Sequence, residues 1–200
     1  MTDFWYRESH SYRRLSRIVD IVGALVAIVL TSPLVVIGAI AVRIESPGNP
    51  FFVQRRVGRF GRLFKLYKIR TMRSDLCGDA LSPGSLTDSR ITRVGAFLRK
   101  LSIDELPQFY NVLIGDMALV GPRPEMPFLV KQYQPWQLLR LFATPGITGL
   151  WQVECRSTVP LHSPKATALD LQYIKSASPL NDGLIVLRTV RAIINARGAY

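Results

Sequence analysis

An uncharged apolar stretch from residue 21 to residue 42 constrains this chain more than any other feature. As a straight helix it would be about 33 Å long at about 1.5 Å per residue, enough to cross a hydrocarbon core of about 30 Å. Ser32 and Pro33 stand in its middle. Proline removes a backbone hydrogen bond and bends a helix, and the serine hydroxyl can satisfy the carbonyl set free.

Basic residues flank this stretch on both sides. Cytoplasmic flanks of membrane helices are rich in Lys and Arg, and a single span cannot place both of its ends in the cytoplasm. The pattern therefore predicts a re-entrant segment that turns near Pro33 and leaves on the side it entered; a kinked true span is the alternative. The stretch begins too late and is too long for a cleavable signal peptide. The flanking residues are Arg7, Arg13, Arg14 and Arg17 before it, and Arg43, Arg55, Arg56, Arg59, Arg62 and Lys65 after it.

The chain of 200 residues, 48% of them hydrophobic, is long enough for one domain with a core. We expect residues 1–45 to form a basic N-terminus and re-entrant membrane helix, broken at Ser32 and Pro33. Residues 46–200 should form a single compact, cytosolic-face catalytic domain with an amphipathic C-terminal helix. The fold class predicted is α+β and mainly helical, with a few short strands and amphipathic surface helices.

Several local elements of this domain are predicted from its pattern. The basic block 55–73 should be a short strand or helix at a lipid interface, and 76–89 a mobile loop that could cover a substrate. The remaining expectations are helices over 91–100, up to Gly115, over 128–142 and over 180–197, a buried strand over 118–120, and a turn leading into a strand over 144–153.

The net charge of +12 and the pI near 10.3 call for an anionic partner, which could be nucleic acid, acidic lipid or a phosphorylated substrate. No aromatic RNA platform or helix-turn-helix motif is found, so we expect no nucleic-acid partner. Two cysteines and two histidines without ligand spacing exclude a disulfide framework and a zinc ribbon. Glycine-rich phosphate loops are absent, so a nucleotide would be held by arginines and a metal ion.

Two adjacent acids, Asp104 and Glu105, lie between Arg99 and an arginine held by two prolines, Arg123. Such a pair suits phosphate chemistry, because one carboxylate can attack or accept a proton while the other binds a divalent metal ion. The alternative is an ordinary helix start, with Ser102 and Glu105 as a capping box. Pro107 favours Asp104 as the N-cap over Ser102.

Five motifs occur in a fixed order: Lys68-Ile-Arg-Thr-Met72, Arg99-Lys-Leu-Ser-Ile-Asp-Glu-Leu-Pro-Gln108, Asn111-Val-Leu-Ile-Gly-Asp-Met117, Val120-Gly-Pro-Arg-Pro124 and Pro145-Gly-Ile-Thr-Gly-Leu-Trp-Gln-Val153. Together they resemble the bacterial sugar transferases, the monotopic polyprenyl-phosphate phosphoglycosyl transferases. The resemblance implies a re-entrant helix broken at a Ser-Pro pair. It also implies transfer of a sugar phosphate from a UDP-sugar to polyprenyl phosphate, usually undecaprenyl phosphate, with release of UMP.

By the same resemblance Asp104 is the nucleophile that forms a phosphosugar-aspartyl intermediate, and Glu105 helps to bind Mg²⁺. Arg99 and Arg123 are the expected phosphate ligands, with Lys68 as a third candidate. The reaction would take place at the cytoplasmic face of the bacterial inner membrane and begin exopolysaccharide, O-antigen or glycoprotein glycan synthesis. Further partners would be membrane lipids, a second copy of the chain, or downstream glycosyltransferases.

The chain departs from the family after Val153. Cys155 and Thr158 stand where members often have a glycine and an acidic residue, and 178–184 replaces a Trp-rich stretch. Asp170, Tyr173 and Ile174 keep the expected pattern. The choice of sugar therefore stays open. Two other functions are also open: a membrane-tethered basic protein that binds acidic lipid or nucleic acid, and an inactive member that acts as a scaffold.

Overall fold

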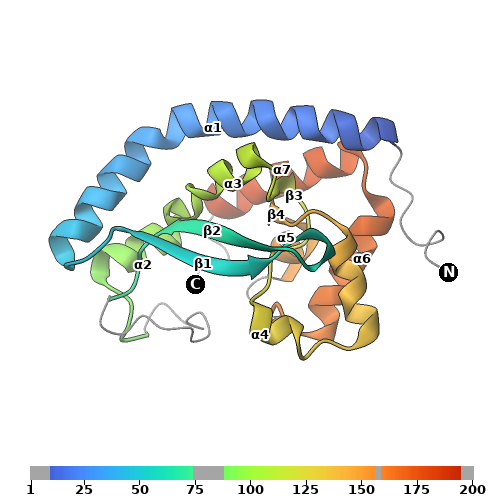
Figure 1. The fold of residues 1–200 in the computed structure, drawn as a ribbon. Coiled ribbons are helices and arrows are strands. Elements are labelled where there is room, and N and C mark those ends of the chain that lie inside the picture. The colour runs from blue at the N-terminus through green and yellow to red at the C-terminus, as the bar shows by residue number, and fades with distance from the viewer. Residues whose placement is uncertain (1–9, 74–87, 156–158, 195–200) are drawn as a thin grey trace.

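A computed structural model describes residues 10–73, 88–155 and 159–194 (Figure 1). Within these ranges the chain is mainly helical with four short strands, which confirms the predicted α+β class. The predicted loop over 76–89 lies almost wholly outside the described residues, as do both Cys77 and Thr158.

The first helix, α1 (His10–Glu45), contains Pro33 and continues through it. The break predicted there is instead a bend, and Figure 1 shows α1 as one curved helix along a side of the molecule. The Ser32 hydroxyl donates to the carbonyl oxygen of Val29 at 3.0 Å. This carbonyl lies four residues before Pro33, so it is the one that the missing proline N–H leaves without its helical partner. The local role predicted for Ser32 is therefore confirmed.

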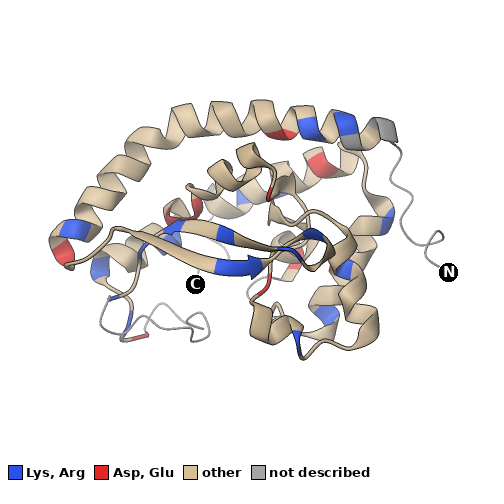
Figure 2. Cartoon of the chain, in the orientation of Figure 1, with Lys and Arg blue, Asp and Glu red and all other residues tan. Residues whose placement is uncertain are grey.

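The outer face of α1 is apolar and exposed, and its inner face packs against the rest of the protein. Within the described residues, α1 is the one helix long and apolar enough to cross a membrane, and Figure 2 shows charge only toward its two ends. Its buried residues include Ala24 and Val42. Its exposed apolar side chains are Leu15, Ile18, Val19, Val22, Leu25, Val26, Val29, Leu30, Leu34, Val36, Ile37, Ile40 and Ile44.

The basic block forms an antiparallel hairpin of β1 (Phe51–Val57) and β2 (Leu63–Ile69), in which Phe51 pairs with Ile69 and Val57 with Leu63. Its turn contains the short helix η1 (Arg59–Gly61), where Phe60 and Gly61 both have positive φ. A second, parallel pair joins β3 (Ala118–Val120) to β4 (Gly146–Thr148).

The other helices surround these two small sheets (Figure 1). They are α2 (Arg93–Lys100), η3 (Ile103–Glu105), α3 (Gln108–Ile114), α4 (Pro127–Val130), η4 (Pro135–Phe142), α5 (Leu150–Cys155), α6 (Pro164–Ser176) and α7 (Pro179–Ile194). The strand over 118–120 and the helix end at Gly115, whose φ is +93°, agree with prediction. The helix predicted over 128–142 is divided into α4 and η4, and the strand predicted to reach Val153 ends at Thr148, where α5 soon follows.

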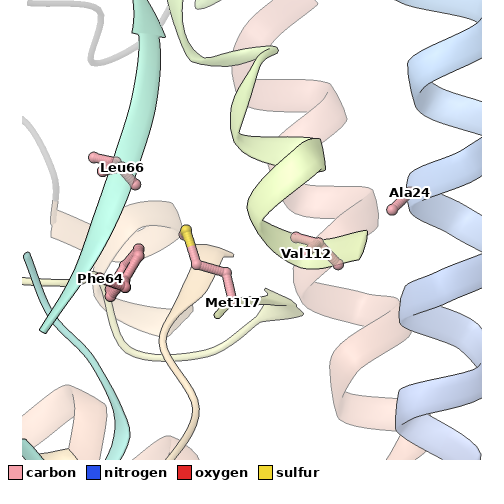
Figure 3. Close-up of a cluster of buried hydrophobic side chains, with 5 residues drawn as sticks. All are labelled: Ala24, Phe64, Leu66, Val112 and Met117. Carbon is pink, nitrogen blue, oxygen red and sulfur yellow. The ribbon is translucent and has the colours of Figure 1, made fainter. Parts of the chain in front are cut away.

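A core cluster joins α1 to the rest of the molecule. Ala24 on α1 points toward Val112 on α3, and Met117 lies between Val112 and the β2 residue Phe64 (Figure 3). All of these side chains are at least nine-tenths buried. Because α1, α3 and β2 share one core, the membrane-type helix is part of the globular fold and not a separate tether.

Candidate active site

The two acids of the predicted site lie in η3, a single turn between α2 and α3. Ser102 precedes this turn with φ 56° and makes no side-chain cap bond, so the capping-box alternative is wrong. Asp104 is likewise not an N-cap: it lies inside η3, and α3 begins only after Pro107. Both acids are buried, with 6% of Asp104 and 9% of Glu105 exposed.

Glu105 is bound by two cations from different elements. The Lys68 ammonium, from β2, donates to Oε1 of Glu105 at 2.8 Å. Arg123, from the turn after β3, reaches both carboxylate oxygens, with its Nη1 3.4 Å from Oε2 and its Nη2 donating to Oε1. The guanidinium therefore meets the carboxylate as a two-pronged fork, a geometry that matches carboxylate and phosphate alike.

Arg99 approaches the pair from the last turn of α2. Its Nε donates to the hydroxyl of Thr71 at 2.7 Å, which ties α2 to the end of β2. Burial lowers the pKa of Arg99, while the charges of Asp104 and Glu105 oppose this shift. The structure thus brings together the five predicted site residues that lie outside α1; Ser32 and Pro33 lie apart from them in α1.

The cations of the cluster differ in how firmly they hold their protons. Burial lowers the pKa of Lys68, and the neighbouring Glu105 only partly offsets it. Burial also disfavours charged Arg123, but Glu105, Asp104 and Glu125 together outweigh this effect and raise the pKa of Arg123. Arg123 is therefore a fixed positive charge beside the acids.

Sequence reasoning missed a residue that positions Arg123. Arg140, in η4, is 2% exposed and donates from Nη2 to the main-chain oxygen of Arg123 at 2.9 Å. It also pairs with Asp170 of α6 and donates to the hydroxyl of Tyr133 at 2.6 Å. Nothing in the local sequence around Arg140 distinguishes it from a surface arginine, because its partners come from distant segments.

Asn111 is a second residue to which the sequence analysis gave no role. It is fully buried in α3, and its amide donates to the Lys65 carbonyl at 2.7 Å and accepts from the Tyr67 N–H at 3.2 Å. These bonds fix the strand that carries Lys68 against the helix that follows the acid pair. Its occurrence in one of the five motifs was the available signal.

In the described part of the chain, no three metal-ligating side chains gather in one place. The acid pair nevertheless suits Mg²⁺ in its donor chemistry, because that ion is usually bound by one or two carboxylates together with substrate phosphates. Carboxylates beside fixed cations, all largely screened from water, form an arrangement that can bind a diphosphate and present an anionic nucleophile to it.

Comparison with known proteins agrees with this chemistry. The profile of the family described as bacterial sugar transferase matches residues 11–196. A UDP-N-acetylgalactosamine-undecaprenyl-phosphate N-acetylgalactosaminephosphotransferase of Aeromonas hydrophila is 41% identical over 94% of this chain and 45% of its own length. A UDP-glucose:undecaprenyl-phosphate glucose-1-phosphate transferase of Caulobacter vibrioides is 41% identical over 92% and 71%. An undecaprenyl-phosphate galactose phosphotransferase of Salmonella typhimurium is 36% identical over 95% and 42%. The chain thus spans about half the length of several relatives.

Proposed function

Because this chain belongs to the bacterial sugar transferase family, we propose that it transfers a sugar 1-phosphate from a UDP-sugar to undecaprenyl phosphate and releases UMP. The three relatives named above differ in their sugars but share undecaprenyl phosphate in their names. The acceptor is therefore assigned by class, while the sugar is left unassigned. Such a transfer would begin the synthesis of a cell-surface polysaccharide.

The observation that supports this function best is the placing of Asp104 and Glu105 inside a cluster of cations. Lys68 and Arg123 bind Glu105 directly, and Arg99 interacts electrostatically with both acids. A UDP-sugar brings two phosphates, whose charge would otherwise repel an attacking carboxylate. Cations fixed in a site that largely excludes water offset that repulsion strongly, because the local dielectric constant is low.

In the proposed first step, a carboxylate oxygen of Asp104 bonds to the phosphorus of the phosphate next to the sugar. The bond from that phosphorus to the bridging oxygen breaks, and UMP leaves with the electron pair. In the second step, a phosphate oxygen of the acceptor lipid bonds to the same phosphorus and Asp104 leaves as a carboxylate. Arg123 and Arg99 would hold the phosphate oxygens, and Lys68 would neutralise charge beside Glu105.

Mg²⁺ is the proposed cofactor, and Glu105 together with the donor's phosphate oxygens would hold it. When bound, the ion would withdraw negative charge from the diphosphate. Because Lys68 and Arg123 already bind Glu105, we expect Mg²⁺ to bind weakly without a UDP-sugar and more tightly with one.

We further propose that α1 is re-entrant and that the site works at the cytoplasmic face of the bacterial inner membrane. Near one end of α1, Arg17 donates to the carbonyl oxygens of Val112 and Leu113. At the other end, the carboxylate of Glu45 accepts hydrogen bonds from the backbone N–H groups of Arg93 and Val94. A globular body on one side of a bilayer can hold both ends only if the helix between them does not cross.

The test is a UMP assay on the full chain in lipid nanodiscs, with Mg²⁺ and a panel of UDP-sugars but no acceptor. We expect a burst of about one UMP per protein and a protein mass increased by one sugar phosphate. Asp104→Asn should give neither, whereas Glu154→Gln, which neutralises an exposed acid, should behave as wild type. No UMP from any sugar would contradict the proposed function. A wild-type burst from Asp104→Asn would contradict only the covalent step.

A further inference from the structure

A cavity of about 250 Å³ opens beside the acid pair, between η3, α3 and the second half of α7. This is larger than the cavity of about 150 Å³ that holds benzene in an engineered protein core. Its lining is mostly apolar, with six polar or charged residues among fifteen. The residues are Lys100, Ser102, Glu105, Leu106, Phe109, Leu119, Ile147, Thr148, Gln152, Val153, Val186, Thr189, Val190, Ala192 and Ile193.

Apart from Thr189, the α7 wall of the cavity consists of apolar side chains, several of which the fold leaves uncovered. Val186, Val190 and Ile193 are 39%, 50% and 40% exposed. The neighbouring Ile185, which points into the core, is 1% exposed. The wall is therefore held in place by the opposite face of the same helix, while its own apolar surface stays available for a ligand.

The cavity meets the proposed reaction centre at one residue. Among the described residues, Glu105 alone belongs both to the lining and to the ion-pair cluster with Lys68 and Arg123. The other lining residues nearest to it in sequence are Leu106, Ser102, Phe109 and the cation Lys100. A ligand with a phosphate at Glu105's end and a hydrocarbon chain beyond it would match this change from charged to apolar surroundings.

A sugar nucleotide does not match the cavity, because a nucleoside and a hexose would leave many hydroxyl groups against Leu, Val and Ile side chains without hydrogen bonds. A hydrocarbon chain has no such cost, and its burial is favourable in proportion to the apolar area covered. Of the two substrates in the proposed reaction, only the acceptor has such a chain.

We propose that this cavity binds the first isoprene units of the acceptor lipid, next to its phosphate. The proposal rests on the proposed function, since it takes the acceptor from there, and adds the place where its chain is held. The cavity volume admits only the start of the chain. The remainder would leave past Val190 and Ile193, at the α7 edge of the cavity, toward the lipid.

The first experiment fills the cavity and measures the two half-reactions separately. Val186→Trp and Ala192→Phe place bulk in the cavity, while Leu187→Trp places it on the adjacent outward position of α7, where the side chain is 67% exposed and does not line the cavity. We expect all three to keep the UMP burst without acceptor. The two cavity variants should raise the KM for undecaprenyl phosphate roughly tenfold over Leu187→Trp.

The second experiment needs no catalysis. A prenyl phosphate with a diazirine on its second isoprene unit is photolysed with the full chain in nanodiscs, and the labelled peptides are identified by mass spectrometry. Labels within 186–193 or 106–109 are expected, and should be lost in Ala192→Phe.

The outcomes separate the two proposals. An unchanged KM in both cavity variants, or labels only outside those segments, would overturn the cavity assignment while leaving the UMP burst to support the transferase function. Labelling that excess phosphatidylglycerol abolishes would show a general acyl-chain site and would also overturn it. A wild-type chain without a UMP burst, labelled as expected, would contradict the transferase function and keep the binding site.

Discussion

At the scale of single residues, Glu105 organises the site. It accepts hydrogen bonds from Lys68 of β2 and Arg123 of the turn after β3, so three segments distant in sequence meet at one carboxylate. Asp104 is next to it in the same turn and stays among these cations. Neutralising either acid should therefore change the charge balance of the whole cluster and not one contact alone.

Arg123→Lys should weaken the donor half-reaction although it keeps the charge. Lysine cannot form the two-pronged contact that Arg123 makes, and a hydrogen bond to a charged group is worth about 1.5–3 kcal/mol. We expect kcat/KM for the UMP burst to fall by roughly ten- to a hundredfold. Arg62→Lys, at an exposed position of the hairpin turn, is the matched control. Equal rates for both variants would contradict the role given to Arg123.

Asp170→Asn should destabilise the fold and loosen Arg123 through Arg140. Asp170 and Arg140 are 1% and 2% exposed, and leaving one partner of a buried ion pair alone costs about 3–5 kcal/mol. Thermal and urea unfolding in detergent should show this loss. A double variant, Asp170→Asn with Arg140→Gln, should recover part of it, because no charge is then left buried without its partner.

The difference between Asp104 and Arg140 shows what the sequence could predict at this scale. Asp104, Glu105 and Arg123 stand in short motifs whose residue types already suggest phosphate chemistry. Arg140 acts through the main chain of Arg123 and through Asp170, 30 residues further along. Such a role depends on tertiary packing, which no local pattern encodes. The N-cap predicted for Asp104 was wrong for a related reason: the left-handed backbone at Ser102 creates a separate turn.

At the scale of elements, α1 is stabilised at its bend by its own sequence. The Ser32 hydroxyl satisfies the Val29 carbonyl that Pro33 leaves open, so the proline costs less than it would in an apolar helix without this serine. The bend was predictable from Ser-Pro alone. The sequence did not predict that the helical backbone of α1 continues through Pro33, because the packing of α1 against α2 and α3 decides how far a proline opens a helix.

Pro33→Leu should straighten α1 and shift part of the protein to a spanning topology. The substitution restores the backbone hydrogen bond and extends the apolar run, so crossing becomes less costly. Single cysteines placed at Ser16 and at the exposed Asn49, in a chain with Cys77 and Cys155 changed to Ser, would be labelled in sealed vesicles. Both should react from the same side in the otherwise wild-type chain. Labels on opposite sides there would contradict re-entry.

Gly95→Ala should separate α2 from the end of β2. A Cβ at Gly95 would overlap the backbone carbonyl of Thr71, the residue whose hydroxyl binds Arg99. Overpacking of this kind costs about 1–3 kcal/mol, and the displaced Arg99 should slow UMP release as well. Gly183→Ala in α7 is the control, because nothing lies near its Cβ. Unfolding curves and the UMP burst together would measure both effects.

The elements that sequence patterns missed are those decided by neighbours. Residues 150–153 were expected to continue a strand, and Trp151 and Val153 are residue types common in strands. They form α5 instead, with Trp151 buried and its indole N–H donating to the Val159 carbonyl at 3.1 Å. β4 ends at Thr148, which pairs with Val120, the last residue of its partner β3.

At the scale of the whole molecule, the fold places a charged reaction centre beside an apolar surface. The outward face of α1 is apolar along most of its length, while its inner face shares a core with β2 and α3. The net charge of +12 adds attraction to anionic headgroups. Two separate forces, burial of α1 and surface charge, should therefore hold the protein at the bilayer.

These two forces can be separated by salt. At about 1 M salt the Debye length falls to about 3 Å, which screens attraction between the basic surface and anionic lipids. The burial of α1 is unaffected by screening, so we expect the full chain to float with vesicles of phosphatidylglycerol and phosphatidylcholine at both low and high salt. Replacing the exposed Val29, Leu30 and Ile37 by Ser should make flotation depend on low salt and on anionic lipid. Release of the wild-type chain by salt would show that charge alone holds it, and would contradict insertion of α1.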